Sequence, residues 1–196
     1  MNRIRRWAIP LGLTLLCTTL QALPACAVLQ YQRAAILRGQ WWRLLTGNLV
    51  HLGWGHLVHD LAGLWLIWLL FGRQLRTRTW LALLLCDALA IGLGLFLCSP
   101  QVHWYVGISA LLYGLFTAGC LATWRNRPGY ASLLLAGMLA LVGWSIWIGP
   151  LPAEDWGIGG PVLPVAHGYG VLGASLFMLG RWAWLGARAA GRAGEP

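Results

Sequence analysis

The sequence predicts an all-α membrane protein, a bundle of six transmembrane helices in a single domain over residues 1–196, and three observations support this. Hydrophobic residues make up 59% of the chain and charged residues only 10%, well below the ~25% typical of soluble domains. The mean hydropathy is +0.66. Six separate segments each offer about 20 mostly apolar residues, the length that crosses a bilayer as a helix.

The segments outside the spans are expected to form an outer loop at 27–54 and a cytoplasmic tail at 185–196. The outer loop contains ILRGQWWRLL, whose helical pattern puts apolar residues on one face, so an amphipathic helix along the outer membrane surface is expected. The start of the chain is similar to a signal segment but is expected to stay in place as the first span. The six predicted spans are 7–26, 55–72, 79–98, 106–124, 130–149 and 163–184.

The arginines predict the orientation of the bundle. All 14 basic residues are arginines, and most flank alternate ends of the spans, which by the positive-inside rule puts both termini in the cytoplasm. The exception is the outer loop, with Arg33, Arg38 and Arg43. No basic face interleaved with aromatic residues is present, so no nucleic-acid partner is predicted. The cytoplasmic groups are Arg3, Arg5 and Arg6; Arg73, Arg76 and Arg78; Arg125 and Arg127; and Arg181, Arg188 and Arg192, whereas the outer 150–162 loop carries Glu154 and Asp155.

This orientation brings the most reactive polar residues to one depth. The second, fourth and sixth spans all enter from the outer face. Near their outer ends lie His51, His56 and Asp60 for the second, Ser109 for the fourth, and His167 for the sixth. Polar and ionisable groups inside a membrane are costly, so their clustering points to a functional site.

Small residues predict that the fourth and sixth spans pack closely. Each span repeats alanine or glycine every fourth residue, which lets helix backbones approach. Ser109 and His167 lie beside these ridges, so their side chains are expected to meet, and Tyr113, one turn from Ser109, is expected to stack on the imidazole. The ridges are Ala110, Gly114, Ala118 and Ala122, and Ala166, Gly170 and Ala174.

A serine and a histidine within reach of each other can form a nucleophile–base dyad, because the imidazole takes the hydroxyl proton. The backbone N–H of Ser109 and a side chain of the second span are expected to stabilise the oxyanion. Other interpretations stay open. Most membrane serines only pack helix interfaces, His56 and His167 could ligate a haem, and a transporter is disfavoured because no internal repeat is present. Asp87 is interpreted as a hydrogen-bonding partner that faces the bundle.

Four motifs between residues 40 and 175 resemble those of the rhomboid family of intramembrane serine proteases. They are GISA at 107–110, AHGYG at 166–170, the pattern of His51, His56 and Asp60, and the pair Trp42 and Arg43. The resemblance implies a six-helix rhomboid-like bundle that needs no cofactor or metal. It implies Ser109 as nucleophile, His167 as general base, Tyr113 as its aromatic partner, and Gly107, His56 and Asp60 around the oxyanion.

Within the family, WWRLLTGNLVHLGWGHL and YVGIS are most similar to the rhombosortase branch, which is associated with cleaving a C-terminal Gly-Gly-containing membrane tail from exported bacterial proteins. The implied partners are the lipid bilayer and transmembrane or C-terminally anchored proteins. The implied location is the bacterial inner membrane, with the site open to the periplasmic side.

Two residues depart from the family's motifs. Asp60 stands where the family has asparagine, and an ionised carboxylate repels an oxyanion. Asp60 is therefore expected to be protonated, turned away, or used to orient a histidine. Ala110 replaces a glycine after the nucleophile. A catalytically inactive rhomboid-like protein that binds membrane segments stays open as an alternative.

Overall fold

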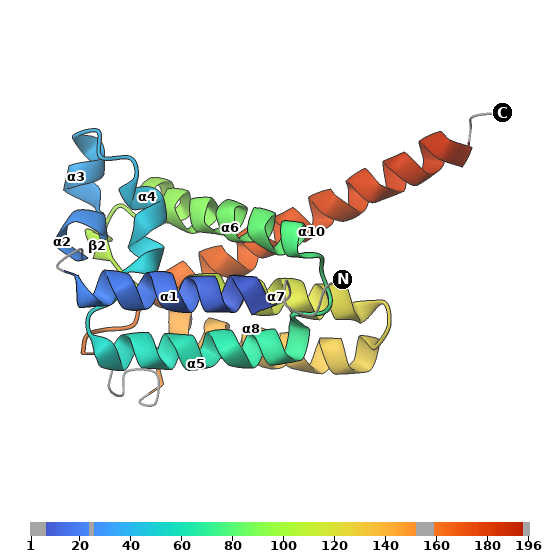
Figure 1. Ribbon diagram of the computed structural model, residues 1–196, viewed down its shortest axis with the longest axis horizontal. Coiled ribbons are helices and arrows are strands. Elements are labelled where there is room, and N and C mark those ends of the chain that lie inside the picture. The colour runs from blue at the N-terminus through green and yellow to red at the C-terminus, as the bar shows by residue number, and fades with distance from the viewer. Residues whose placement is uncertain (1–6, 24–25, 152–158, 194–196) are drawn as a thin grey trace.

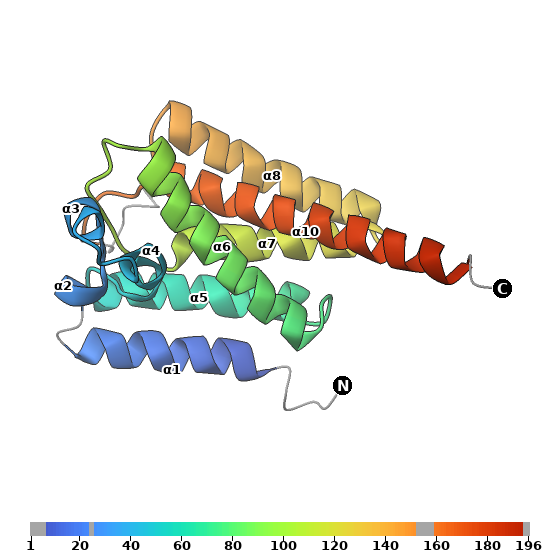
Figure 2. The ribbon, with the colours of Figure 1, turned by 90° about the horizontal axis from the view of Figure 1, so that it is seen from above.

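The computed structural model of the protein describes residues 7–23, 26–151 and 159–193. Long helices run alongside one another, and a group of short elements lies at one end of the bundle, at the left in Figure 1 (Figures 1 and 2). The long helices are α1 (Ala8–Ala22), α5 (Trp54–Phe71), α6 (Thr77–Cys98), α7 (Ser109–Trp124), α8 (Pro128–Trp147) and α10 (Pro164–Ala193). The short elements are α2 (Cys26–Leu29), α3 (Arg33–Leu37), α4 (Arg43–Thr46), η2 (Gly47–Leu49), and the antiparallel strands β1 (Tyr31–Gln32) and β2 (Trp104–Tyr105).

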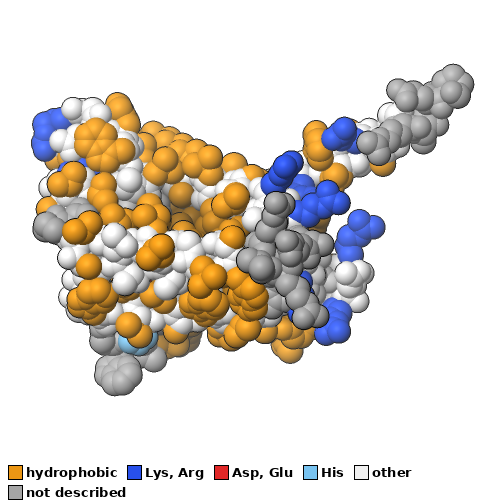
Figure 3. Space-filling model, in the orientation of Figure 1, with side chains coloured by type: hydrophobic (Ala, Val, Ile, Leu, Met, Phe, Trp, Pro, Cys, Tyr) orange, Lys and Arg blue, Asp and Glu red, His pale blue; other side chains and the backbone are white. Residues whose placement is uncertain are grey.

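The surface of the bundle is that of an integral membrane protein. Among the described residues, α5, α6 and α8 are long and apolar enough to cross a membrane, and α1 and α7 are shorter apolar helices. Leu69, Leu133 and Trp147 are 67%, 73% and 86% exposed, respectively, and Figure 3 shows hydrophobic side chains spread over the face in view. Soluble proteins rarely expose apolar patches on this scale. The count of six spans and the cytoplasmic termini remain predictions.

The long helices lie where the spans are predicted, but several ends differ. Helix α7 begins at Ser109 rather than at 106, because Trp104 and Tyr105 form β2 and Gly107 then takes a φ of +115°. Helix α10 continues to Ala193, so the segment predicted as a tail is helical as far as it is described. The arginines at 3–6 and the two acidic residues of the 150–162 loop lie outside the described residues.

The outer loop folds differently from the prediction of one amphipathic helix. Helix α3 ends at Leu37 and α4 begins at Arg43, so the pattern ILRGQWWRLL is split into two short helices. Gly39 lies between them with a φ of +95°, a backbone conformation that glycine adopts readily and other residues rarely do. The apolar periodicity was compatible with a helix, but the glycine turn breaks it.

Two arginines of the predicted outer loop bind backbone carbonyls. Arg33 donates to the Phe96 carbonyl at 2.7 Å and lies 4.9 Å from the centre of the Phe96 ring, so it caps the negative end of α6. Arg43 is buried and donates to the Gln30 carbonyl at 2.8 Å and to Gln40 Oε1 at 2.6 Å. Most of the basic side chains visible in Figure 3 gather at the opposite end of the bundle.

Helix α7 lies inside the bundle, in contact with α5, α6, α8 and α10. Most of its residues are buried. Its closest approaches involve glycines, because a Cβ at Gly119 would overlap Phe71 of α5 and a Cβ at Gly170 of α10 would overlap the Ala110 carbonyl. The start of α7 is therefore held at a fixed place among its neighbours.

Candidate active site

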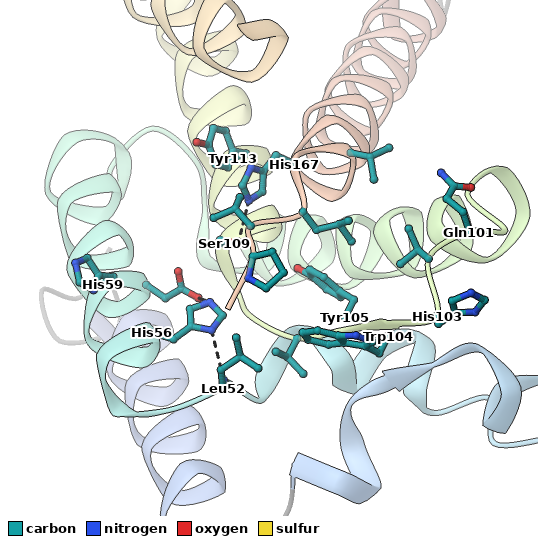
Figure 4. Close-up of a pocket in the computed structure, with 17 residues that line it drawn as sticks. Leu52, His56, His59, Gln101, His103, Trp104, Tyr105, Ser109, Tyr113 and His167 are labelled. Atoms are coloured by element: carbon teal, nitrogen blue, oxygen red, sulfur yellow. Dashed lines mark hydrogen bonds and ion pairs between the residues drawn. The ribbon is translucent and has the colours of Figure 1, made fainter. Parts of the chain in front are cut away.

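Ser109 and His167 lie together at the starts of two adjacent helices. Ser109 is the first residue of α7, and His167 is in the first turn of α10. The distance from Ser109 Oγ to His167 Nε2 is 3.1 Å, and Figure 4 shows the two side chains pointing toward each other. The histidine is buried and the serine is partly exposed. At this distance Nε2 can accept the hydroxyl proton when Nδ1 carries the ring hydrogen.

The packing of α7 on α10 produces this contact. Ala110, Ala166 and Ala174 have no exposed surface, and Gly170 lies against the Ala110 carbonyl. Small facing residues let the two backbones approach closely. Ser109 directly precedes Ala110 and His167 directly follows Ala166, so the side chains meet beside the contact, as the small-residue ridges predict.

The ring of Tyr113 lies flat against the imidazole. The Tyr113 and His167 ring centres are 4.3 Å apart and their planes differ by 21°. Tyr113 is one turn beyond Ser109 on α7, so the same helix supplies both the serine and the surface that supports the histidine. Stacking restricts rotation of the imidazole and keeps Nε2 directed at Ser109.

Asp60 is the centre of a second polar cluster. Its Oδ2 accepts a hydrogen bond from the backbone N–H of Ile108 at 3.1 Å, and it lies 3.2 Å from His51 Nε2 and 3.3 Å from His56 Nε2. The side chains of His51, His56 and Asp60 are all buried. The Asp60 carboxyl group therefore links three parts of the chain. These are α5, the segment before α5 that carries His51, and Ile108, which directly precedes Ser109. Of the roles expected for Asp60, this arrangement corresponds to orienting a histidine.

The hydrogen bonds of His56 assign its tautomer. The backbone N–H of Leu52 donates to His56 Nδ1 at 3.4 Å, so the ring hydrogen is on Nε2, the nitrogen that faces Asp60. The single N–H of His56 is thus directed at Asp60, at the wall of the cavity that His56 shares with Ser109.

Gly107 shapes the chain between this cluster and Ser109. Its φ is +115°, and a Cβ at this position would lie 2.8 Å from ring atoms of His56. Its N–H donates to the Gly47 carbonyl at 3.2 Å, and its carbonyl accepts a hydrogen bond from the Tyr105 hydroxyl at 2.7 Å. Burial raises the pKa of Tyr105, so the phenol remains a neutral donor.

Two cavities meet at Ser109. The first has a volume of about 570 Å³ and is lined by His56, His167 and residues 101–106, among others. The second, of about 530 Å³, lies between α5, α7 and α8 and is lined mainly by apolar side chains. Ser109, Asp60 and Tyr113 line both cavities. Ser109 can therefore be reached from both cavities, and the first of them is the one that also contains His56 and His167.

The sequence identified most of this cluster but not every contact. His51 belongs to the predicted polar group without an assigned role, and the structure places it against Asp60. Tyr105 begins the YVGIS motif but has no predicted role, because its position depends on the pairing of β2 with β1. His59 is exposed at the cavity rim, with Nδ1 2.9 Å from the Gly55 carbonyl.

The ring nitrogens of His56 and His167 that face the cavity are in contact with other side chains. Nε2 of His167 faces Ser109, and Nε2 of His56 faces Asp60, so the nitrogens that would ligate a haem already have protein partners. Within the described part of the chain, no group of three or more histidine, cysteine or acidic side chains could hold a metal ion.

Comparison with known proteins assigns the family. The family model of the rhomboid domain matches residues 38–183, most of the chain. The protein belongs to the rhomboid family. The putative rhomboid protease YdcA of Bacillus subtilis (strain 168) is 28% identical over 81 residues, which is 41% of each chain. The rhomboid protease GluP of the same organism is 23% identical over 111 residues, 57% of this chain and 22% of GluP. The match thus spans less than half the length of these relatives.

We predict that the substitution Gly107→Ala in this rhomboid slows the reaction of Ser109 with a serine-directed fluorophosphonate at least tenfold. The new methyl group would strain the backbone by about 1–3 kcal/mol and press on the His56 ring. Gly39→Ala is the matched control, because Gly39 also has a positive φ but a Cβ there meets nothing within 4 Å. Equal labelling rates for the two variants would contradict the prediction.

Proposed function

We propose that this rhomboid is an intramembrane serine endopeptidase that uses Ser109 and His167 as a catalytic dyad. The observation that carries the proposal is the 3.1 Å contact between Ser109 Oγ and His167 Nε2 at the junction of two cavities. Membership of the family and the two rhomboid proteases among the relatives support it.

In the proposed reaction, Ser109 Oγ attacks the carbonyl carbon of the scissile peptide bond while His167 Nε2 takes the hydroxyl proton. The tetrahedral intermediate collapses, the C–N bond breaks, and His167 gives the proton to the departing amine. Water then attacks the ester and gives a proton to His167. Cleavage of the ester returns this proton to Ser109 and releases the new carboxyl group.

The oxyanion is stabilised by donors at the start of α7 and by His56. The first N–H groups of a helix have no partner within it, so the amide of Ser109 is available to an oxygen in the cavity. His56 carries its ring hydrogen on Nε2, which lies 3.3 Å from Asp60 Oδ2, so in this proposal the oxyanion shares that donor with Asp60. Asp60 acts as a positioning residue that holds His56 and the Ile108 amide, rather than as an oxyanion donor.

The length of α7 places Ser109 at a depth suited to this reaction. A helix of 16 residues is about 24 Å long, shorter than the ~30 Å hydrocarbon core, so at least one end lies inside the core. We infer that this is the Ser109 end and that it faces the outer, periplasmic side of a bacterial inner membrane. The first cavity then gives water access to the ester.

The proposed substrates are membrane-anchored proteins whose apolar segment enters the groove between α5 and α8. This second cavity is lined by leucines, Phe116 and Met138 and reaches Ser109. The resemblance to rhombosortases favours exported proteins with a C-terminal Gly-Gly-type membrane tail. Glycines beside an apolar helix let the backbone open into an extended conformation that a nucleophile can reach.

Labelling with a fluorophosphonate probe tests the dyad. The substitution Ser109→Ala is expected to abolish covalent labelling, and His167→Ala to slow it by roughly 10²–10⁴-fold because the general base is lost. Ser175→Ala is the matched control, since Ser175 is on α10 and its hydroxyl donates to the Val171 carbonyl. Undiminished labelling of Ser109→Ala would rule out Ser109 as the nucleophile.

Variants of Asp60 test its positioning role. Asparagine keeps an acceptor oxygen for the Ile108 amide but loses the charged partner of the histidines, so Asp60→Asn is expected to lower the labelling rate roughly tenfold, and Asp60→Ala roughly 100-fold. Val58→Ala, at an exposed position on α5, serves as the control. If Asp60→Asn matched or exceeded the wild type, the carboxyl group would instead be an oxyanion donor.

A reporter tests the proposed substrate class. A soluble domain with a C-terminal membrane segment preceded by Gly-Gly is expected to be released by the wild type in proteoliposomes but not by Ser109→Ala. Replacing Gly-Gly by Leu-Leu in the reporter is expected to reduce release at least tenfold, as measured by mass spectrometry of the soluble product. Equal release of both reporters would remove the Gly-Gly preference and leave the protease activity in place.

A further inference from the structure

Asp87 is a buried acidic residue that the proposed reaction does not use. It lies near the middle of α6 and has no exposed surface. The backbone N–H of Ala174 on α10 is the polar group that acts on this carboxyl group, but among the described residues no side chain lies within hydrogen-bond distance of either oxygen, and both ion pairs found there belong to Asp60. An unpaired charge is costly inside a membrane, so a carboxyl group in this environment is favoured in its neutral form.

The carboxyl group occupies a space that two glycines leave open. A Cβ at Gly114 of α7 would overlap Asp87 Oδ2, and a Cβ at Gly173 of α10 would lie 2.6 Å from Asp87 Oδ1. One oxygen therefore lies against the backbone of α7 and the other against the backbone of α10. No larger residue fits at either glycine while Asp87 keeps its place.

The two helices that Asp87 contacts are those that carry Ser109 and His167. Gly114 is five residues beyond Ser109 (109 to 114), and Gly173 is six beyond His167 (167 to 173). At 1.5 Å per residue, the carboxyl group contacts both helices roughly 8 to 9 Å along their axes from the dyad. Close to the dyad the helices touch directly, through Ala110 and Gly170. The contact between Ala110 and Gly170 and the carboxyl group of Asp87 together define how α7 and α10 lie relative to each other.

We propose that Asp87, as a neutral carboxyl group, is a positioning residue that sets the spacing of α7 and α10 and thereby the distance between Ser109 Oγ and His167 Nε2. This inference rests on the proposed function. Asp87 acts through the two helices and touches neither side chain of the dyad. Its short, flat side chain fits between two backbones where a leucine would not.

The shape and the charge of Asp87 can be separated by substitution. Asp87→Asn keeps the shape without the ability to ionise, and its labelling rate is expected to stay within threefold of the wild type. Asp87→Ala empties the space, and the maximal labelling rate is expected to fall at least tenfold at an unchanged half-saturating probe concentration. A change in the maximal rate alone points to altered dyad geometry, whereas general unfolding lowers the fraction of labelled protein.

A double substitution tests the contact itself. Gly114→Ala is expected to lower both the labelling rate and the unfolding temperature, because its methyl group meets the carboxyl group of Asp87. In the variant Asp87→Ala/Gly114→Ala the methyl group has room, and both quantities are expected to recover partly toward the wild type. Gly143→Ala on α8 is the control, because a Cβ there meets nothing within 4 Å and Gly143 lines neither cavity.

Each other outcome overturns a defined part of the inference. Wild-type labelling of Asp87→Ala would show that Asp87 does not position the dyad, and an undiminished effect of Gly114→Ala in the Asp87→Ala background would show that the two residues are not coupled. Asp87→Asn as slow as Asp87→Ala would mean that the carboxyl group itself is required. A wild-type protein that is not labelled at Ser109 would overturn the proposed function, and the positioning role with it.

Discussion

The close approach of α7 and α10 is the constraint on which the rest of the site depends. Lipid does not drive helices together as water does, so helices in a membrane associate through close packing and polar contacts. Here the Ala110 carbonyl lies against Gly170, and this contact brings Ser109 within 3.1 Å of His167. A bulkier residue at Gly170 would separate the helices and with them the hydroxyl group and the imidazole.

The second polar cluster fixes the chain that leads into α7. Asp60 binds the Ile108 amide and lies beside His51 and His56, so α5 and the start of α7 share one carboxyl group. Gly107 fits between them because it has no Cβ. Ser109 is thus held from two sides, by α10 through direct packing and by α5 through polar contacts. The geometry around Ser109 and His167 is a property of three helices rather than of one motif.

The sequence predicted the features that depend on local patterns. Apolar length located the long helices, and the repeat of small residues predicted that Ser109 and His167 meet beside Tyr113. Features that depend on distant residues were not predictable. The direction of the Asp60 carboxyl group depends on His51 and on the Ile108 amide, and the role of Arg33 depends on the end of α6. The glycine turn that divides the outer loop is hidden in the sequence because the apolar periodicity continues through it.

The enclosure of α7 has a consequence for how this protein tolerates different membranes. A short helix that faces lipid makes the bilayer thin around it, at a cost that grows with each ångström of mismatch. Helix α7 is short, but most of its surface is covered by neighbouring helices. Helices α5, α6 and α8 are longer and expose apolar side chains, so hydrophobic mismatch acts on them. The depth of Ser109 is therefore set by protein packing and is insulated from the thickness of the surrounding bilayer.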